Sequence, residues 1–560
     1  MKDKLRMLIA FGFGFAALAM PLASFAQNNQ APVGPQHHHY KVVDLGTLGG
    51  PQSFLNEEGN PVFPGAHALN RAGAVAAIGD TSTPDPFNPN CYGADCDTVH
   101  AFAWKAGVQT DLGTLPQNPL MGPQTPCLDC TWSSWAYWIS DSGLIAGESE
   151  NNAIDPLVGA PTSLAVLWKH GKIINLGTLG GNESSAVAVN NGGQVVGGAM
   201  NSTADPYPGR YPDSNFFIFG NGTEAHAFLW NEGKMQDLGT LGGPDSFAFL
   251  VNERGQVAGA SDVDFASNVV TGGPTVHPFL WQQGKMIDLV AHAPAGTFGG
   301  SYGSVSGLND RGQVAGTMYL TGDLTWHSFL WDAGEIKDLG TLGGAITTAV
   351  GLNNAGHVVG RSDVTAVCEI CPAGDQKQLH HPFFWKDGAI TDIGVVSGDT
   401  VGTAYSVNAN DQVVGRTDLC TKVNPNDSCD NVTNIYHAFL WENGSLADLQ
   451  TLALPGSGIT VNDALNINDR GEIAGFGALS SGDQHVVLLI PCDVNHPNVE
   501  GCDYSEVEVT TEAPVRSAQI APASAAASAP KLSPVQMMTR FQSLRVGRNR
   551  RLGTPQTSAQ

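Results

Sequence analysis

The segment Met235-Gln-Asp-Leu-Gly-Thr-Leu-Gly-Gly243, with Ala225-His-Ala-Phe-Leu-Trp230 just before it, decides the fold. Versions of both elements recur along the chain. Each pair is followed by a third element, as in Val251-Asn-Glu-Arg-Gly-Gln-Val-Ala-Gly259. The chain is therefore a tandem repeat, and a repeat of this size indicates a propeller, a solenoid or an array. The repeat does not by itself specify a chemistry.

Each of the three elements occurs eight times, at intervals of about 45 to 70 residues. The Asp-Leu-Gly element starts at Asp44, Asp111, Asn175, Asp237, Asp288, Asp338, Asp392 and Asp448. The Asn-x-x-Gly element starts at Asn70, Ser140, Asn190, Asn252, Asn309, Asn353, Asn408 and Asn468. The aromatic element ends at Trp104, Trp168, Trp230, Trp281, Trp331, Trp385, Trp441 and, in a degenerate copy, Ile490.

The local patterns predict strands. Ala186–Asn190 and Gln194–Gly198 are short valine-rich runs joined by an Asn-x-x-Gly turn, which is typical of a β-hairpin. His226–Trp230 and Lys234–Leu238 form a second hairpin across a turn that ends at Gly233. Each repeat therefore supplies four strands, which we name A (before the Asn-x-x-Gly turn), B (after it), C (the aromatic strand) and D (the Asp-Leu-Gly strand).

Eight four-stranded antiparallel units predict an all-β fold, an eight-bladed β-propeller. The chain opens on a lone D strand at 40–45 and closes on a lone C strand at 485–490. The N-terminal strand is therefore expected to close the last blade and to leave no unpaired edge. Strand A is expected to lie innermost, with the rings of strand C between neighbouring blades. A β-solenoid or array is the alternative.

The motifs His-Ala-Phe-Leu-Trp, Asp-Leu-Gly-Thr-Leu-Gly-Gly and Val-Asn-x-x-Gly-Gln-Val resemble those of the HAF-repeat family of probable extracellular proteins. The resemblance covers nearly all of residues 40–490. It implies export and a repeat fold, and it carries over no catalytic residue. The second repeat departs from the pattern, because Ser163-Leu-Ala-Val-Leu-Trp168 lacks the histidine.

The termini predict processing and disorder. Three basic residues precede the apolar run 7–22, and Ser24-Phe25-Ala26 offers a cleavage site, so residues 1–26 are expected to be a signal peptide. No later stretch is apolar enough to span a membrane. Residues 27–39 are expected to be a disordered leader, 40–502 the propeller, and 503–560 a disordered tail, rich in Ala, Pro and Ser and then basic. The destination is the periplasm or the outside of the cell.

Ten cysteines agree with export. The simplest of the possible disulfide patterns joins near neighbours, namely Cys91 with Cys96, Cys127 with Cys130, Cys368 with Cys371, Cys420 with Cys429, and Cys492 with Cys502. Zinc binding or redox activity by the two Cys-x-x-Cys pairs is the alternative. The recurrent histidines are expected to form hydrogen bonds within their own blades rather than to share one metal ion, and no cofactor is predicted.

Function is expected where the repeats differ. The A–B and C–D turns are tight, so the long B–C and D–A insertions all fall on one face of the ring, the insertion face. Trp132, Trp135, Tyr137 and Trp138 cluster there and could stack on a ligand or else pack into the central channel. A formal charge of −25 argues against nucleic acid as a partner.

These observations favour an exported binding or scaffold protein whose ligand is a glycan or another protein. The alternative is a propeller-type polysaccharide hydrolase or lyase, which would need two carboxylates, or a carboxylate and a histidine, at the ring mouth. Neither the ligand nor the oligomeric state follows from the sequence.

Overall fold

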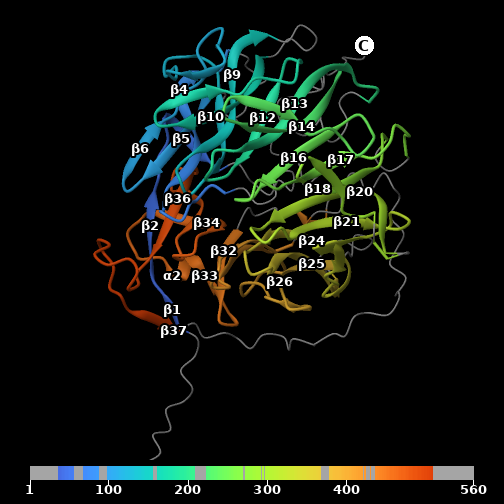
Figure 1. The fold of residues 1–560 in the computed structure, drawn as a ribbon. Helices are drawn as coiled ribbons and strands as arrows, with labels where there is room; N and C mark the ends of the chain where they lie inside the picture. Colours follow the sequence, from blue (N-terminus) through green and yellow to red (C-terminus); the bar gives the residue numbers. More distant parts are fainter. Residues whose placement is uncertain are drawn as a thin grey trace, which may run out of the picture.

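The computed structural model describes residues 36–55, 67–86, 97–154, 161–207, 222–268, 272–291, 293–294, 297–367, 378–420, 422–423, 429–430 and 436–508. Eight antiparallel units of four or five strands follow one another around the molecule in sequence order (Figure 1), and the fourth and fifth are joined into one sheet by a parallel pair, Val276 with Tyr302. The protein is therefore the all-β, eight-bladed propeller that the repeats predict.

The sheets contain the strands in the order A, B, C, D from one edge to the other. Blade 1 consists of β3 (Gly49–Phe54), β4 (Val75–Pro84), β5 (Asp97–Lys105) and β6 (Val108–Asp111), and blade 2 of β8 (Ser134–Ile139), β9 (Ile145–Ile154), β10 (Pro161–Lys169) and β11 (Lys172–Asn175). Blade 3 consists of β12 (Ser184–Val189), β13 (Val195–Ala204), β14 (Thr223–Asn231) and β15 (Lys234–Asp237), and blade 4 of β16 (Ser246–Val251), β17 (Val257–Asp262), β18 (Val276–Gln282) and β19 (Lys285–Asp288). Blade 2 gains a fifth strand, β7 (Gly122–Gln124), on β11.

Blade 5 consists of β20 (Phe298–Leu308), β21 (Val314–Leu320), β22 (Trp326–Asp332) and β23 (Glu335–Asp338), and blade 6 of β24 (Gly343–Leu352), β25 (Val358–Val367), β26 (Gln378–Lys386) and β27 (Ala389–Asp392). Blade 7 consists of β28 (Val401–Val407), β29 (Val413–Asp418), β32 (Tyr436–Glu442) and β33 (Ser445–Asp448), and blade 8 of β34 (Ile459–Ile467), β35 (Ile473–Leu479), β36 (Gln484–Pro491) and β2 (Tyr40–Asp44). A two-stranded ribbon, β30 (Lys422–Val423) with β31 (Cys429–Asp430), lies between β29 and β32 in the chain.

The last blade is closed by the N-terminal strand. β2 pairs with β36 in antiparallel register, from Tyr40 opposite Pro491 to Asp44 opposite Val487. First and last repeats thus share one sheet, which confirms the predicted closure and excludes the open solenoid.

Strand A lies innermost, as predicted, because the A strands of successive blades contact one another. Small residues are required where they meet. A Cβ atom on Gly307 would lie 2.4 Å from the Cβ of Leu352 in the next blade, and one on Gly351 would lie 2.9 Å from the main-chain oxygen of Tyr405. Crowding around the axis therefore explains the small residues near the end of strand A.

The Asn-x-x-Gly turns are linked into a ring. Within each turn the asparagine Oδ1 accepts main-chain N–H groups, as Asn309 does from Arg311 and Gln313. Its Nδ2 group donates to the main-chain oxygen of the equivalent residue in the next blade; the donors are Asn70, Asn190, Asn252, Asn309, Asn353, Asn408 and Asn468. Ser140 takes the eighth place. The Asn-x-x-Gly element thus holds neighbouring blades together.

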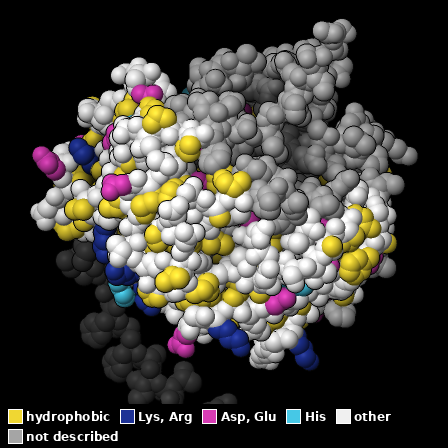
Figure 2. Space-filling model, turned by 90° about the horizontal axis from the view of Figure 1, so that it is seen from above, with side chains coloured by type: hydrophobic (Ala, Val, Ile, Leu, Met, Phe, Trp, Pro, Cys, Tyr) yellow, Lys and Arg dark blue, Asp and Glu magenta, His cyan; other side chains and the backbone are white. Residues whose placement is uncertain are grey.

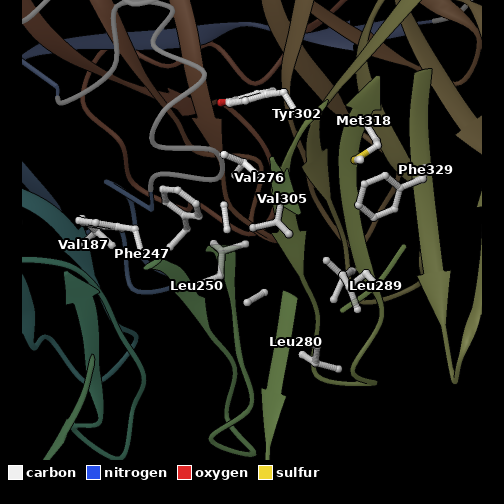
Figure 3. Close-up of a cluster of buried hydrophobic side chains, with 14 of the residues drawn as sticks. Val187, Phe247, Leu250, Val276, Leu280, Leu289, Tyr302, Val305, Met318 and Phe329 are labelled. Carbon is white, nitrogen blue, oxygen red and sulfur yellow. The ribbon is translucent and has the colours of Figure 1, made fainter. Parts of the chain in front are cut away.

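Aromatic and aliphatic side chains fill the spaces between blades. Phe279 and Trp281 of blade 4 pack with Ala188 and Val196 of blade 3 in one buried cluster. This confirms the predicted place of the strand C rings. A larger cluster includes buried side chains of blades 1 to 6, and Figure 3 shows some of them lying together from several strands.

A short two-stranded ribbon lies outside the predicted propeller of residues 40–502. In it β1 (Gln36–His38) pairs with β37 (Glu506–Glu508) in antiparallel register. The His37 side chain is fully buried and contacts Glu442 Oε1 and Ser445 Oγ at 2.9 and 3.1 Å, which holds the leader against blade 7. The predicted signal peptide and most of the basic tail lie outside the described residues.

Among the residues that the structure describes, the only α-helix is the short α2 (Leu449–Leu452), which follows strand D of blade 7. Within the described residues, no helix combines the length and the apolar character needed to cross a membrane.

Candidate functional site

The aromatic segment of blade 2 lies partly in the core. Trp135 and Tyr137 are 1% and 3% exposed on β8, the inner strand of that blade. They belong to the same buried cluster as Phe247 and Phe249 of blade 4. Trp135 and Tyr137 are therefore packed into the core, next to the β-bulge that β8 contains between Ala136 and Trp138.

The other two rings are partly exposed. Trp132 donates its Nε1–H to the main-chain oxygen of Leu115 at 2.9 Å. Trp138 stacks on His67 of blade 1, with ring centroids 5.2 Å apart. Burial lowers the pKa of His67, although a hydrogen bond with the Ile139 carbonyl opposes that effect, so the imidazole is neutral near pH 7. A ligand-binding role for these two rings stays a prediction.

Two of the five expected disulfides are present, Cys127–Cys130 and Cys492–Cys502. Cys127–Cys130 closes the loop that leads into β8. The pairs Cys91/Cys96 and Cys368/Cys371 lie outside the described residues, as does the side chain of Cys429. No group of three or more His, Cys, Asp or Glu side chains that could hold a metal ion is found in the described part of the chain.

The repeated histidines bond to the repeated aspartates. In six blades the Nδ1 atom of the strand C histidine lies within hydrogen-bond distance of the aspartate that begins the Asp-Leu-Gly element; the pairs are His100–Asp111, His226–Asp237, His277–Asp288, His327–Asp338, His381–Asp392 and His485–Asp44. This confirms the predicted hydrogen bond within the blade for these six histidines. In blade 7, His437 contacts Asp399 instead. The histidines are thus structural.

Blade 2 lacks both partners of this pair. Leu164 faces Ser149 of β9 just as His226 faces Ala199 in blade 3, and Asn175 takes the place of Asp237. The Asn175 side chain keeps only the turn contact, accepting from Gly177 N–H at 3.0 Å. Both substitutions are visible in the sequence, but only the structure shows that they remove the two partners of the same hydrogen bond.

A groove of about 690 Å³ opens at this position, on the insertion face between blades 2 and 3. Its walls come from the end of β9 and the start of β10, which contribute Asn151, Ile154, Thr162 and Leu164, and from the D–A loop 177–182. Met121, from the insertion that precedes blade 2, completes the lining. The groove therefore exists where this blade departs from the repeat.

Exposed apolar residues stand at the rim of the groove. The side chains of Met121 and Ile154 are 62% and 48% exposed, and Leu120 beside them is 74% exposed. On the face that Figure 2 views, apolar side chains (yellow) are scattered over the surface together with some acidic (magenta) and basic (dark blue) ones. Such exposed apolar groups at the rim of a groove are typical of a binding surface.

A second, polar cluster lies where blades 7 and 8 meet on the insertion face. Arg416 of β29 contacts Asp463 of β34, and Asp418 and Tyr405 lie close by. Sequence reasoning did not single out these residues. The available signal was arginine at a position of strand B where Gly198 and Ala260 stand in blades 3 and 4.

No protein-family model matches this chain, and no curated protein sequence matches it. Solved structures similar to it include the β-propeller domain of the trilobed protease from Pyrococcus furiosus, with 11% identity, 59% of this chain and 82% of that chain covered, and a TM-score of 0.33. A Mycobacterium tuberculosis puromycin-hydrolyzing peptidase has 11% identity, 76% and 61% coverage, and a TM-score of 0.35.

Trypanosoma rangeli sialidase, in complex with the inhibitor DANA, has 9% identity, with 81% of this chain and 55% of that chain covered, and a TM-score of 0.27. This chain thus spans less than two thirds of the length of the peptidase and of the sialidase. The propeller architecture rests on the strand order and ring closure of this chain.

Proposed function

We propose that the protein is an exported binding or scaffold module that holds its ligand on the insertion face. The groove between blades 2 and 3 carries this proposal, because it lies where blade 2 lacks the repeated His–Asp pair. The N-terminal sequence, the two disulfides and the resemblance to HAF-repeat proteins support export.

The lining indicates the chemistry of the ligand. None of the eleven residues that line the groove, all within the described part of the chain, has an ionisable side chain. Thr162 and Asn151 are polar and are joined by a hydrogen bond from Thr162 Oγ1 to Asn151 Oδ1 at 3.1 Å, while Ile154 and Leu164 present apolar surface. This mixture suits an uncharged, hydroxyl-rich ligand with apolar faces, so a neutral glycan is favoured over a charged protein segment.

The test is binding of the secreted chain to an array of neutral and charged glycans, with Ala153→Trp as the blocking variant. Ala153 is exposed and lines the groove, so the indole would occupy it without disturbing the core. Ala72→Trp, at an exposed position in the Asn-x-x-Gly turn on the opposite face, is the matched control. Binding to neutral glycans that only Ala153→Trp abolishes supports the proposal. Equal binding by both variants contradicts it.

The alternative, a polysaccharide hydrolase or lyase, has one observation in its favour. Asp418 and Asp463 both contact the guanidinium group of Arg416 on the insertion face. Paired carboxylates are the usual machinery of glycoside cleavage. Release of new reducing ends from a polysaccharide, lost in Asp463→Asn but kept in Ala153→Trp, would favour the enzyme.

A further inference from the structure

The polar cluster between blades 7 and 8 is centred on Arg416. Its Nη1 atom lies 2.8 Å from Asp463 Oδ2, and its Nε atom lies 3.8 Å from Asp418 Oδ2. The guanidinium carbon lies 4.6 Å from the centre of the Tyr436 ring. The Arg416 side chain is 27% exposed and that of Asp463 only 6%, so the cluster is sheltered but open to solvent through Arg416.

Three polar groups in this cluster have unused hydrogen-bonding capacity within the described part of the chain. Arg416 carries five N–H donors and makes one hydrogen bond, to Asp463. The half-buried Tyr405 hydroxyl makes none. The Oδ1 atom of Asp418 is buried and has no partner. Because buried polar groups are nearly always paired, such a concentration of unused groups points to a missing ligand.

Arg416 and Tyr405 both offer hydrogen-bond donors, and Asp418 adds a third donor when it carries a proton. Burial raises the pKa of Asp418 to about 6, and the nearby Arg416 opposes that rise. Asp399 and Asp463 raise the pKa further, whereas Arg361 lowers it.

Other titratable side chains face the same cluster. Tyr405 and Tyr436 interact with Arg416, and His437 contacts Asp399. Below about pH 6, Asp418 carries a proton and becomes a hydrogen-bond donor. All three groups with unused capacity are then donors, and a group rich in lone pairs would satisfy them together.

We propose that Arg416, Tyr405 and Asp418 form a binding site for the carboxylate group of a ligand, at the junction of blades 7 and 8 on the insertion face. A carboxylate matches the donor fork of a guanidinium and accepts the two hydroxyl donors beside it. Asp463 fixes the orientation of Arg416 from its other side. The site is separate from the groove of blades 2 and 3, and its existence does not depend on the function proposed for that groove.

The experiment measures binding to the secreted full chain by calorimetry at pH 5 and pH 7.5. The probes are galacturonate, its neutral counterpart galactose, and acetate. We expect galacturonate to bind and galactose to bind at least roughly tenfold more weakly, because the charge-assisted hydrogen bonds are lost. We also expect weaker binding at pH 7.5, where Asp418 is an anion. Binding of acetate as well would show that the carboxylate suffices; binding of galacturonate alone would assign the sugar ring a part.

Variants distinguish ligand binding by these residues from a purely structural role. Asp418→Asn keeps a hydrogen-bond donor that does not titrate, so it should bind equally at both pH values. Tyr405→Phe removes only a hydroxyl and should weaken binding severalfold without unfolding. Arg254→Gln, in an exposed turn on the opposite face, is the control. Equal affinity for galacturonate and galactose, no binding at either pH, or an unchanged pH dependence in Asp418→Asn would overturn the proposal.

Discussion

Asn468 of the last blade donates its side-chain Nδ2–H to the main-chain oxygen of Asn70 in the first blade, at 3.0 Å. This hydrogen bond joins the last blade to the first, and so completes the ring of linked Asn-x-x-Gly turns. Its Oδ1 atom also accepts from the main-chain N–H groups of Arg470 and Glu472. One side chain therefore shapes its own turn and joins the two ends of the ring.

Replacing this asparagine should destabilise the propeller. Asn468→Ala leaves two main-chain donors and the Asn70 carbonyl without their partners in a buried place, and we expect a loss of about 2 kcal/mol or more. The midpoint of thermal unfolding measures it. Asn231→Ala, at an exposed position beside the C–D turn of blade 3, should have little effect. A similar loss in both variants would argue against a special role for the ring of asparagines.

Restoring the eighth member of the ring should stabilise the protein. Ser140 occupies the asparagine position of blade 2, and its hydroxyl contacts Ser142 Oγ at 2.9 Å rather than reaching the next blade. In Ser140→Asn we expect a new hydrogen bond to the Asn190 carbonyl, worth about 1 kcal/mol. A higher unfolding midpoint is the expected result. A midpoint at or below that of the parent would show that the turn of blade 2 cannot accept the longer side chain.

The His226–Asp237 pair should make stability depend on pH. Burial would lower the pKa of His226, but the hydrogen bond and charge of Asp237 outweigh it and raise the pKa above 6.5. Burial would raise the pKa of Asp237, but the contacts from His226 and Gly239 hold it below 3.8.

The two pKa shifts define a pH range in which the His226–Asp237 pair stabilises the fold. The histidine contribution is fully present below about pH 6.5 and fades as the pH rises through the raised pKa. The aspartate contribution is present above about pH 3.8 and fades as the pH falls through the lowered pKa. The destabilisation caused by His226→Asn should therefore be greatest near pH 5 and smaller near pH 8, as unfolding midpoints measured across that range will show. A constant difference would contradict the pairing.

Trp135 should act as a core residue. Its side chain is almost fully buried, so Trp135→Ala would leave a large cavity, at an expected loss of about 3–5 kcal/mol. Trp132→Ala removes a partly exposed ring with one hydrogen bond and should lose less. Unfolding midpoints of the two variants decide the order. Lost ligand binding with unchanged stability in Trp135→Ala would instead place this ring in a binding site.

The candidate sites were less predictable than the fold, and particular residues show why. The loss of histidine at Leu164 could be seen in the repeat, but the groove beside it depends on Met121 and on the loop 177–182, which only folding brings together. Arg416 and Asp463 belong to different repeats and meet because the blades pack side by side. Neither juxtaposition follows from spacing along the chain.

The sequence alone determined the strands, their turns, the number of blades and the closure by residues 40–45, because these follow from local patterns that are repeated and from where the pattern begins and ends. The tertiary structure decided which side chains pack or form hydrogen bonds within the ring and which remain available to a ligand. Trp135 became core and Asn468 a link between blades, since burial and partners depend on the neighbouring blade. Packing between repeats is a property of the closed ring, and no single repeat encodes it.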